Sequence, residues 1–208
     1  MAAVPAAEVP GQGAIRPSVN LRPLPRRFYA RDSLEVGPDL IGRVLVREAG
    51  GVRMAGRIVE VEAYRPDDPA SHSFRGPTQR NATMFGPAGH AYVYVSHGIH
   101  HCLNLTTGRG AAVLLRALEP VEGVPEMVRR RGTVQPRLLC AGPGRLCQAL
   151  GVALADDGKD LTRRDGLWVA AGEPVPSVRA TPRVGISVAV DAAWRFVEEG
   201  SRYLSRGR

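Results

Sequence analysis

The sequence predicts an α+β fold, a single compact domain in which a mostly antiparallel, curved sheet is flanked by helices. The chain has 208 residues, a length that suits one domain. Of these residues, 44% are hydrophobic, which is enough to bury a sizeable core. Segments with strand character form hairpins early in the chain and helical segments follow later, an order typical of antiparallel sheets with segregated helices.

The chain divides into a tail and a domain. Residues 1–25 are rich in Ala and Pro and lack hydrophobic periodicity, so we expect a disordered tail there. Residues 26–208 are expected to form the folded domain, with structure starting near Phe28.

The first structured segments are a short helix and a β-hairpin. Asp32 or Ser33 is a suitable N-terminal cap for a helix that ends near Gly42. Residues 43–64 then alternate in the manner of two strands, and the turn between them is predicted at Gly50-Gly51.

Later segments complete the predicted sheet and its helices. Strands are expected at residues 90–95, 102–105, 111–120, 166–172 and 183–188, and helices at 120–132 and 142–152. Pro143 lies at a favourable first helical position of the last of these helices.

The charge of the chain indicates a polyanionic partner. The net charge is +8 and the pI is about 10.2, which is typical of proteins that bind nucleic acid or an acidic membrane surface. Solubility alone explains such a charge equally well. Lys159 is the only lysine among the 28 basic residues, and arginine is the residue that binds phosphate with two parallel hydrogen bonds.

The cysteines and the hydropathy pattern bear on the compartment. Cys102, Cys140 and Cys147 form no C-x-x-C pair and are odd in number, which indicates reduced thiols. No stretch of 18 apolar residues and no secretory signal is present. We therefore expect a cytoplasmic protein without membrane contact, associated with the nucleoid if its source is bacterial.

Functional side chains are concentrated between residues 60 and 104. Glu60, Glu62 and Tyr64 alternate along one strand and share a face, because side chains two apart point the same way. All five histidines lie between positions 72 and 101, and Tyr92 and Tyr94 share a face of a nearby strand. This combination suits a pocket for a nucleobase, with aromatic faces for stacking and a carboxylate for acid–base chemistry. The alternative is a polar surface sheet with scattered aromatic residues.

Several motifs carry a resemblance to a known family. The segments are "RIVEVEAY", "ASHSFRG", "RNATMFGPAGHAYVYVSHGIHHCLN", "AAVLLRALEP" and "PRVGI". Together they resemble the alkyladenine (3-methyladenine or methylpurine) DNA glycosylases over residues 28–205. The resemblance implies a monofunctional enzyme that flips alkylated or deaminated purines out of double-stranded DNA, hydrolyses the N-glycosidic bond and leaves an abasic site. It implies no metal or other cofactor, and we expect a monomer.

The resemblance assigns the catalytic residues. Glu62 stabilises the positive charge that develops on the sugar and deprotonates the attacking water. Arg116 and the backbone carbonyl of Val184 orient that water. Glu60 is expected to be the structural partner of an arginine, and a strand-end salt bridge is the alternative for Arg116.

The resemblance also assigns the base pocket and the residue that enters the DNA. Tyr64 stacks on one face of the flipped base, and His72 and Tyr94 close the other face. Asn104 excludes guanine by crowding the purine 2-position, or else only satisfies backbone groups of its strand. The resemblance implies that His97 and Ile99 are the wedge that enters the DNA, and the family often carries a tyrosine at the position of His97.

Other functions compete with this one. A basic module with aromatic residues can bind nucleic acid without catalysis. His97, His100 and His101 could suggest a metal hydrolase, but they follow a turn into a strand and lack a thiolate or carboxylate at matching spacing. A glycosylase with lyase activity needs an amine, and Lys159 lies in "ADDGKD", which is typical of a solvated turn.

Overall fold

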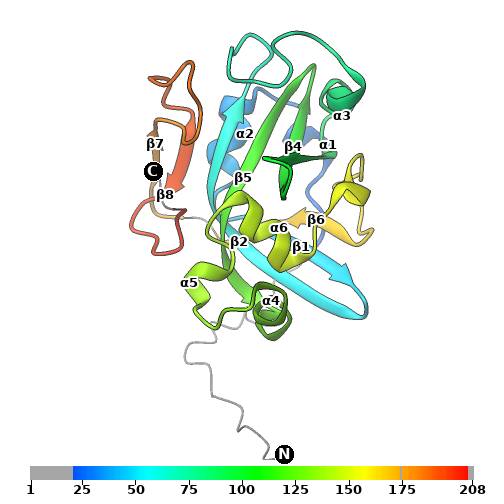
Figure 1. The fold of residues 1–208 in the computed structure, drawn as a ribbon, viewed down its shortest axis with the longest axis vertical. Coiled ribbons are helices and arrows are strands. Elements are labelled where there is room, and N and C mark those ends of the chain that lie inside the picture. Colours follow the sequence, from blue (N-terminus) through cyan, green and yellow to red (C-terminus); the bar gives the residue numbers. More distant parts are fainter. Residues whose placement is uncertain (1–20, 174, 206–208) are drawn as a thin grey trace, which may run out of the picture.

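The computed structural model describes residues 21–173 and 175–205. Its centre is an antiparallel sheet of eight strands with the order β3-β4-β5-β2-β1-β6, to which the β7–β8 pair is joined through β2 (Figure 1). The strands are β1 Val44–Ala49, β2 Val52–Tyr64, β3 Ala91–Ser96, β4 His100–Gly108, β5 Ala111–Glu122, β6 Leu167–Ala170, β7 Val178–Thr181 and β8 Arg195–Glu198. The α+β architecture with a curled antiparallel sheet is therefore confirmed.

Short helices surround this sheet, and α4 to α6 gather at one end of β5 (Figure 1). The α-helices are α1 Arg26–Tyr29, α2 Ser33–Leu40, α3 Ala82–Phe85, α4 Val124–Arg131, α5 Pro136–Leu139 and α6 Pro143–Leu150. Two 3₁₀ turns, Gln79–Asn81 and Leu154–Asp156, complete the described elements.

The described part of the predicted tail lies against β6. Leu24 donates its backbone N–H to Val169 at 2.8 Å, and the indole of Trp168 donates to the Leu21 carbonyl at 2.8 Å. Residues 21–25 therefore pack with the domain, contrary to the expected boundary at residue 25, because the edge of β6 offers them backbone partners. Residues 1–20, the rest of the predicted tail, lie outside the described residues.

The local predictions for the first elements are confirmed. The Asp32 side chain caps α2 by accepting from the Leu34 N–H at 2.9 Å. The β1–β2 hairpin turns at Gly50 and Gly51, whose φ values of 59° and 75° suit glycine. Pro143 is the first residue of α6.

Three later predictions need correction. The strand expected at 102–105 is longer, because β4 pairs with β3 from His100 onward. The segment 120–132 is only partly helical, because β5 continues to Glu122 before Gly123 turns the chain into α4. The strand predicted at 183–188 does not form. Its backbone instead runs as a loop between β7 and β8, in which Val184 bonds to side chains of the central sheet.

Irregular pairing between β2 and β5 is the feature of the sheet that matters most for the site. Ile58 pairs with Leu118, but Glu60 pairs with Ala117, so Val59 is an extra residue on β2. Arg116 is an extra residue on β5, because Val61 then pairs with Leu115. Such bulges bend a strand and redirect a side chain.

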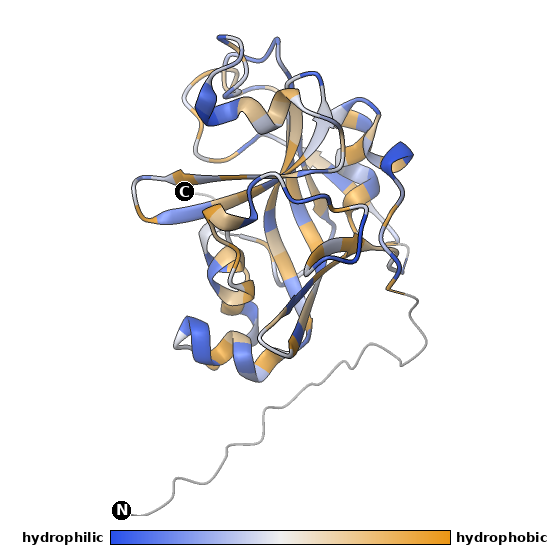
Figure 2. Cartoon of the chain, turned by 90° about the vertical axis from the view of Figure 1, so that its right-hand side faces the viewer, coloured by the Kyte–Doolittle hydropathy of each residue, from blue (hydrophilic) through white to orange (hydrophobic). Residues whose placement is uncertain are grey.

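One apolar core joins the sheet to its helices. Leu40 of α2 and Leu146 and Leu150 of α6 belong to the same buried cluster as Leu115 and Leu118 of β5. Figure 2 shows apolar colouring along the central strands and hydrophilic colouring on the outer helices and loops. The apolar side chains of β5 therefore fix where α6 and the polar residues of the sheet lie.

Gly123 is expected to tolerate no side chain. Its φ is 70°, and an added Cβ would lie 2.7 Å from Met54 Cγ and closer still to the Arg53 carbonyl oxygen. Gly123→Ala should lower the free energy of unfolding by at least ~2 kcal/mol, from strain plus the clash. Urea unfolding measures this. Gly50→Ala is the control, because its φ is similar and nothing lies within 4 Å. Equal losses for both variants would contradict the clash.

Candidate active site

A cavity of about 800 Å³ opens over β2, β3, β4 and β5. Its remaining walls come from the loop that follows β2, from Met84 of α3, from the end of α4 and the start of α6, from the loop after β7 and from Ser205. The residues that line it and were predicted for the site are Tyr64, His72, Tyr94, His97, Asn104, Arg116 and Val184. The fold therefore brings together seven of the predicted residues, although they span 121 positions of the sequence.

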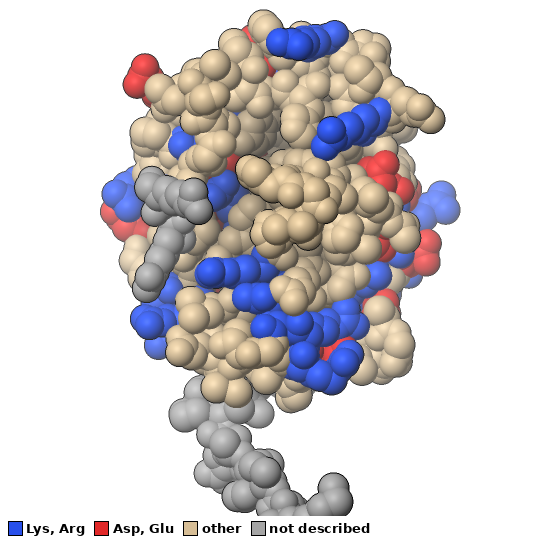
Figure 3. All heavy atoms as spheres, in the orientation of Figure 1, with Lys and Arg blue, Asp and Glu red and all other residues tan. Residues whose placement is uncertain are grey.

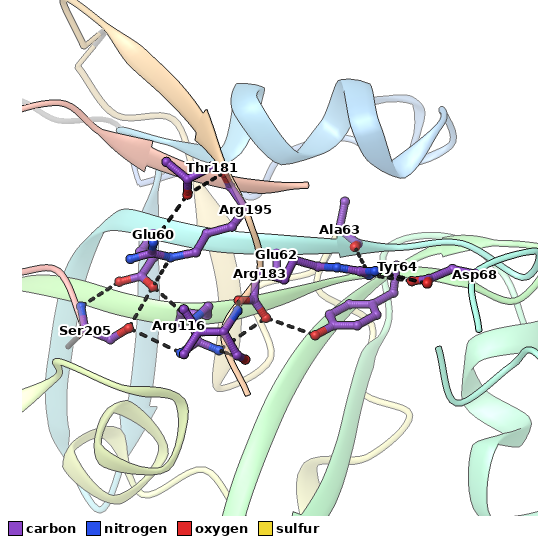
Figure 4. Close-up of polar contacts among 11 residues, drawn as sticks. Glu60, Glu62, Ala63, Tyr64, Asp68, Arg116, Thr181, Arg183, Arg195 and Ser205 are labelled. Carbon is purple, nitrogen blue, oxygen red and sulfur yellow. Dashed lines mark hydrogen bonds and ion pairs between the residues drawn. The ribbon is translucent and has the colours of Figure 1, made fainter. Parts of the chain in front are cut away.

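Glu62 lies behind the residues that line the cavity and has no exposed surface. One carboxylate oxygen accepts from the Val184 backbone N–H at 2.7 Å. The other accepts from the Tyr64 hydroxyl at 2.9 Å and from Arg116 Nη1 at 3.2 Å. Three cavity-lining residues thus fix the position of Glu62 (Figure 4).

Glu60 and Glu62 point to the same side of β2, as predicted, and Arg116 lies between them (Figure 4). Arg116 Nε donates to Glu60 at 2.9 Å. Arg195 Nε donates to the same Glu60 oxygen at 2.8 Å, and the Ser205 N–H and hydroxyl donate to Glu60 at 2.6 and 2.7 Å. Glu60 is therefore the structural partner of two arginines, and Arg116 makes a buried network rather than a strand-end salt bridge.

This network sets the ionisation of Glu60. Burial pushes the pKa of Glu60 upward, but hydrogen bonds from Arg195 and Ser205 and the charges of Arg116 and Arg195 outweigh burial. The pKa of Glu60 therefore lies below its usual range. Arg116 Nη1 also approaches the Val184 carbonyl at 3.4 Å, so this backbone group and the guanidinium meet at the cavity wall.

The aromatic walls come from three segments. Burial raises the pKa of Tyr64 far above its usual range, and the neighbouring charge of Glu62 adds to this effect. The Tyr64 hydroxyl therefore keeps the proton that it donates to Glu62. His72 and Tyr94 meet edge to face with ring centroids 4.5 Å apart. His72 Nδ1 lies 3.0 Å from the Tyr92 hydroxyl. Burial and the charge of Arg80 lower the pKa of His72, which favours the neutral imidazole.

Asn104 both lines the cavity and satisfies its strand. It is buried on β4, and its side-chain amide donates to the Tyr92 carbonyl at 3.2 Å. Cys102, two residues earlier, also lines the cavity, and burial raises the pKa of its thiol. The two readings of Asn104 are thus compatible, because one amide hydrogen bond leaves other polar positions of the side chain free for a ligand.

His97 and Ile99 form the exposed tip of the β3–β4 hairpin. Ile99 donates its N–H to Ser96 at 3.2 Å, and His97 and Gly98 have φ values of 50° and 73°, as in type I′ turns. Ile99 is 74% exposed. Because His97 and His100 also line the cavity, the tip lies at its mouth.

Positive charge gathers beside the cavity, over α4 to α6 (Figure 3). Arg131 and Arg145 line the cavity itself. Arg129 and Arg130 are instead bound to Glu126 at 2.7 Å. Arg75 and Arg80 border a smaller cavity of about 330 Å³, which shares His72 and Tyr92 with the first cavity.

The histidines do not converge on a metal-binding geometry within residues 21–173 and 175–205. No group of three or more His, Cys, Asp or Glu residues there could hold a metal ion. Along the same part of the chain, no helix is long and apolar enough to cross a membrane.

Two residues of the site were not predicted from the sequence. Ser205 lines the cavity and bonds to Glu60, and Arg183 bonds to Asp68. The "PRVGI" motif contained Arg183, but no local pattern marked it. Their partners lie 145 and 115 positions away, so only the folded chain reveals them.

Comparison with known proteins identifies the family. The model of the family described as "Methylpurine-DNA glycosylase (MPG)" matches residues 27–202. Relatives named "putative 3-methyladenine DNA glycosylase" include one from Methanoculleus marisnigri, 52% identical, and one from Carboxydothermus hydrogenoformans, 47% identical. Each match covers 88% of this chain and 98% of the relative.

A third relative with the same name, from Agrobacterium fabrum, is 50% identical over 88% of this chain and 92% of its own length. These matches define a hydrolase of N-glycosyl bonds that acts on DNA. The chain belongs to the methylpurine-DNA glycosylase family, as the resemblance predicted.

Glu60→Gln should destabilise the protein strongly. Removing the charge leaves Arg116 and Arg195 buried without their shared partner, which typically costs about 3–5 kcal/mol. Because the folded pKa of Glu60 is lowered, its contribution is present above the unfolded value near ~4.3 and is lost as pH falls through the folded pKa. Chemical unfolding from pH 3 to 7 measures both effects.

Glu48→Gln is the matched control for this variant. Glu48 pairs with Arg53 and Arg164, but its side chain is 34% exposed. Its loss should cost no more than ~1 kcal/mol. A loss at Glu60 as small as that at Glu48 would show that the buried network contributes little to stability.

Proposed function

We propose that the protein flips alkylated or deaminated purine nucleotides out of double-stranded DNA and hydrolyses their N-glycosidic bond. The proposal depends most on one observation, the buried Glu62 carboxylate held by Tyr64, Arg116 and Val184 behind an aromatic-walled cavity. Family membership supplies the reaction class. The geometry supports this assignment of roles over a module that binds nucleic acid without catalysis, since stacking alone needs no buried carboxylate.

In this proposal Glu62 acts on the sugar and on water. Loss of the purine builds positive charge on the deoxyribose, and a nearby fixed carboxylate stabilises that charge. Arg116 Nη1 and the Val184 carbonyl, 3.4 Å apart, orient the attacking water. Glu62 Oε2 accepts from both Tyr64 and Arg116, whereas Oε1 accepts only from the Val184 N–H among the described residues, so Oε1 keeps an acceptor position for the proton of this water.

The cavity walls would hold the base and the hairpin tip would hold the DNA open. Tyr64 stacks on one face of the base, and His72 and Tyr94 close the other. Asn104 restricts the purine 2-position. His97 and Ile99 fill the gap in the helix, for which an exposed apolar side chain on a tight turn is suited.

We further propose that the enzyme acts as a monomer and leaves an intact abasic site. Lyase chemistry requires an amine that forms a Schiff base. Lys159 is the only lysine, and it is paired with Asp156 at 2.9 Å and is absent from the cavity lining.

Glu62→Gln should abolish excision without abolishing binding. The substitution preserves size and removes the charge that stabilises the sugar, so the single-turnover rate should fall at least ~10²- to 10³-fold. Release of free hypoxanthine, 3-methyladenine or ethenoadenine from DNA measures the rate, and a gel-shift titration measures binding.

Glu119→Gln is the control, since Glu119 is a partly exposed carboxylate of β5 that pairs with Arg57. It should excise at the wild-type rate. Excision by Glu62→Gln at a rate close to that of Glu119→Gln would rule out the role of Glu62.

His97→Ala should slow excision most where unpairing costs most. Without the imidazole the gap left by the flipped base is unfilled, so hypoxanthine opposite thymine should react roughly tenfold more slowly, corresponding to about 1.4 kcal/mol of stacking. Hypoxanthine in a looser mismatch should be less affected. His97→Tyr should restore or improve both rates, because the phenol ring is larger. If His97→Ala matches the wild type on both duplexes, His97 is only a turn residue.

A further inference from the structure

A buried arginine that no catalytic role requires lies behind the stacking wall. The Arg183 side chain is fully buried and absent from the cavity lining. Its guanidinium carbon lies 4.7 Å from the centroid of the Tyr64 ring and 5.0 Å from that of Trp194. Because Tyr64 lines the cavity and Arg183 does not, we place the cation on the face of Tyr64 turned away from the cavity.

Polar groups hold two of the three nitrogens of the Arg183 guanidinium. Arg183 Nη2 donates to Asp68 Oδ1 at 3.0 Å, and Nη1 donates to Asp68 Oδ2 and to the Ala63 carbonyl at 3.1 Å. Figure 4 shows these contacts above the Tyr64 ring. Arg183 Nε has no partner among the described residues, and Asp68 Oδ1 also accepts from the Ala70 N–H at 3.0 Å. Asp68 therefore pairs with Arg183 through both carboxylate oxygens, while the guanidinium carbon of the pair lies 4.7 Å from the centroid of the Tyr64 ring.

The position of this charge affects what the other face of Tyr64 binds. An aromatic face attracts a cation through its negative quadrupole. When a guanidinium already occupies one face, a second cation on the opposite face gains less and is repelled by the first. A neutral base, by contrast, keeps its stacking and dispersion energy.

Candidate substrates differ in this charge. A nucleotide with 3-methyladenine or another N3- or N7-alkylated purine carries a formal positive charge on the base, whereas hypoxanthine and ethenoadenine nucleotides are neutral. We propose, on the basis of the function proposed above, that Arg183 is a specificity-determining residue that biases the pocket toward neutral damaged purines and against cationic ones. It acts through Tyr64, without touching the substrate.

Arg183 also links the three segments that form the wall. It precedes Val184, whose N–H holds Glu62, and it binds Asp68 in the loop that leads to His72. A purely structural role would therefore slow excision of every base alike. The ratio of rates for cationic and neutral bases separates the two roles, since only an electrostatic role changes it.

The experiment compares single-turnover release of 3-methyladenine with that of hypoxanthine and ethenoadenine. Asp68→Asn keeps the shape and leaves Arg183 without its counter-charge, so the ratio of cationic to neutral excision should fall about threefold or more. Arg183→Gln with Asp68→Asn removes both charges, so the ratio should rise about three- to tenfold. Arg183→Lys keeps the charge and should leave the ratio near that of the wild type, even if every rate falls.

Opposite shifts in the two neutralised variants support the proposal. Unchanged ratios in both, or shifts of the same sign, would overturn it. If the double variant does not fold, the sign of the shift in Asp68→Asn decides, because a rise or no change there contradicts the proposal. A wild-type protein that releases none of the three bases would overturn the proposed function and this inference with it, whereas changed rates with unchanged ratios overturn only the inference.

Discussion

Arg116 holds two buried carboxylates together, and the candidate site depends on that contact. Glu60 and Glu62 have no exposed surface and point the same way from one strand. Two buried carboxylates that share one partner would repel each other if no cation lay between them. Arg116 lies between them and Arg195 lies on the far side of Glu60, so two guanidinium groups offset two carboxylates.

The backbone makes this arrangement possible. A regular β2–β5 ladder would direct the side chain of position 116 by simple alternation, but the compensating extra residues Val59 and Arg116 change the register at this point. The network then recruits Arg195 from β8 and Ser205 from the C-terminal segment. β2 and β5 of the central sheet and the C-terminal β8 and Ser205 all have to be in place before Glu60 has its full set of partners. Formation of the site is therefore tied to completion of the fold.

The alternation of apolar and polar residues and the turn residues predicted most of the fold and the buried face of β2, because these signals are local. Gly50-Gly51 marked a hairpin, and spacing by two placed Glu60, Glu62 and Tyr64 together. The strand predicted at 183–188 does not form, and the reason cannot be read from the alternation of residues along the chain. Val184 uses its N–H and carbonyl for Glu62 and Arg116, 122 and 68 positions away, instead of for a neighbouring strand. The site residues came from family resemblance, and the roles of Arg183 and Ser205 required contacts across the folded chain.

The same network decides how much negative charge reaches the cavity wall. A buried carboxylate without hydrogen-bond partners is costly, since burial disfavours the charged form. A guanidinium bound fully to Glu62 would instead cancel the charge that a cationic sugar needs. Arg116 avoids both extremes because it is shared: its Nε lies 2.9 Å from Glu60, and its Nη1 lies 3.2 Å from Glu62. The neutral donors of Val184 and Tyr64 supply the remaining hydrogen bonds of Glu62. Glu60, although it does not line the cavity, thus shares Arg116 with Glu62, so the guanidinium is not bound to the carboxylate behind the cavity wall alone.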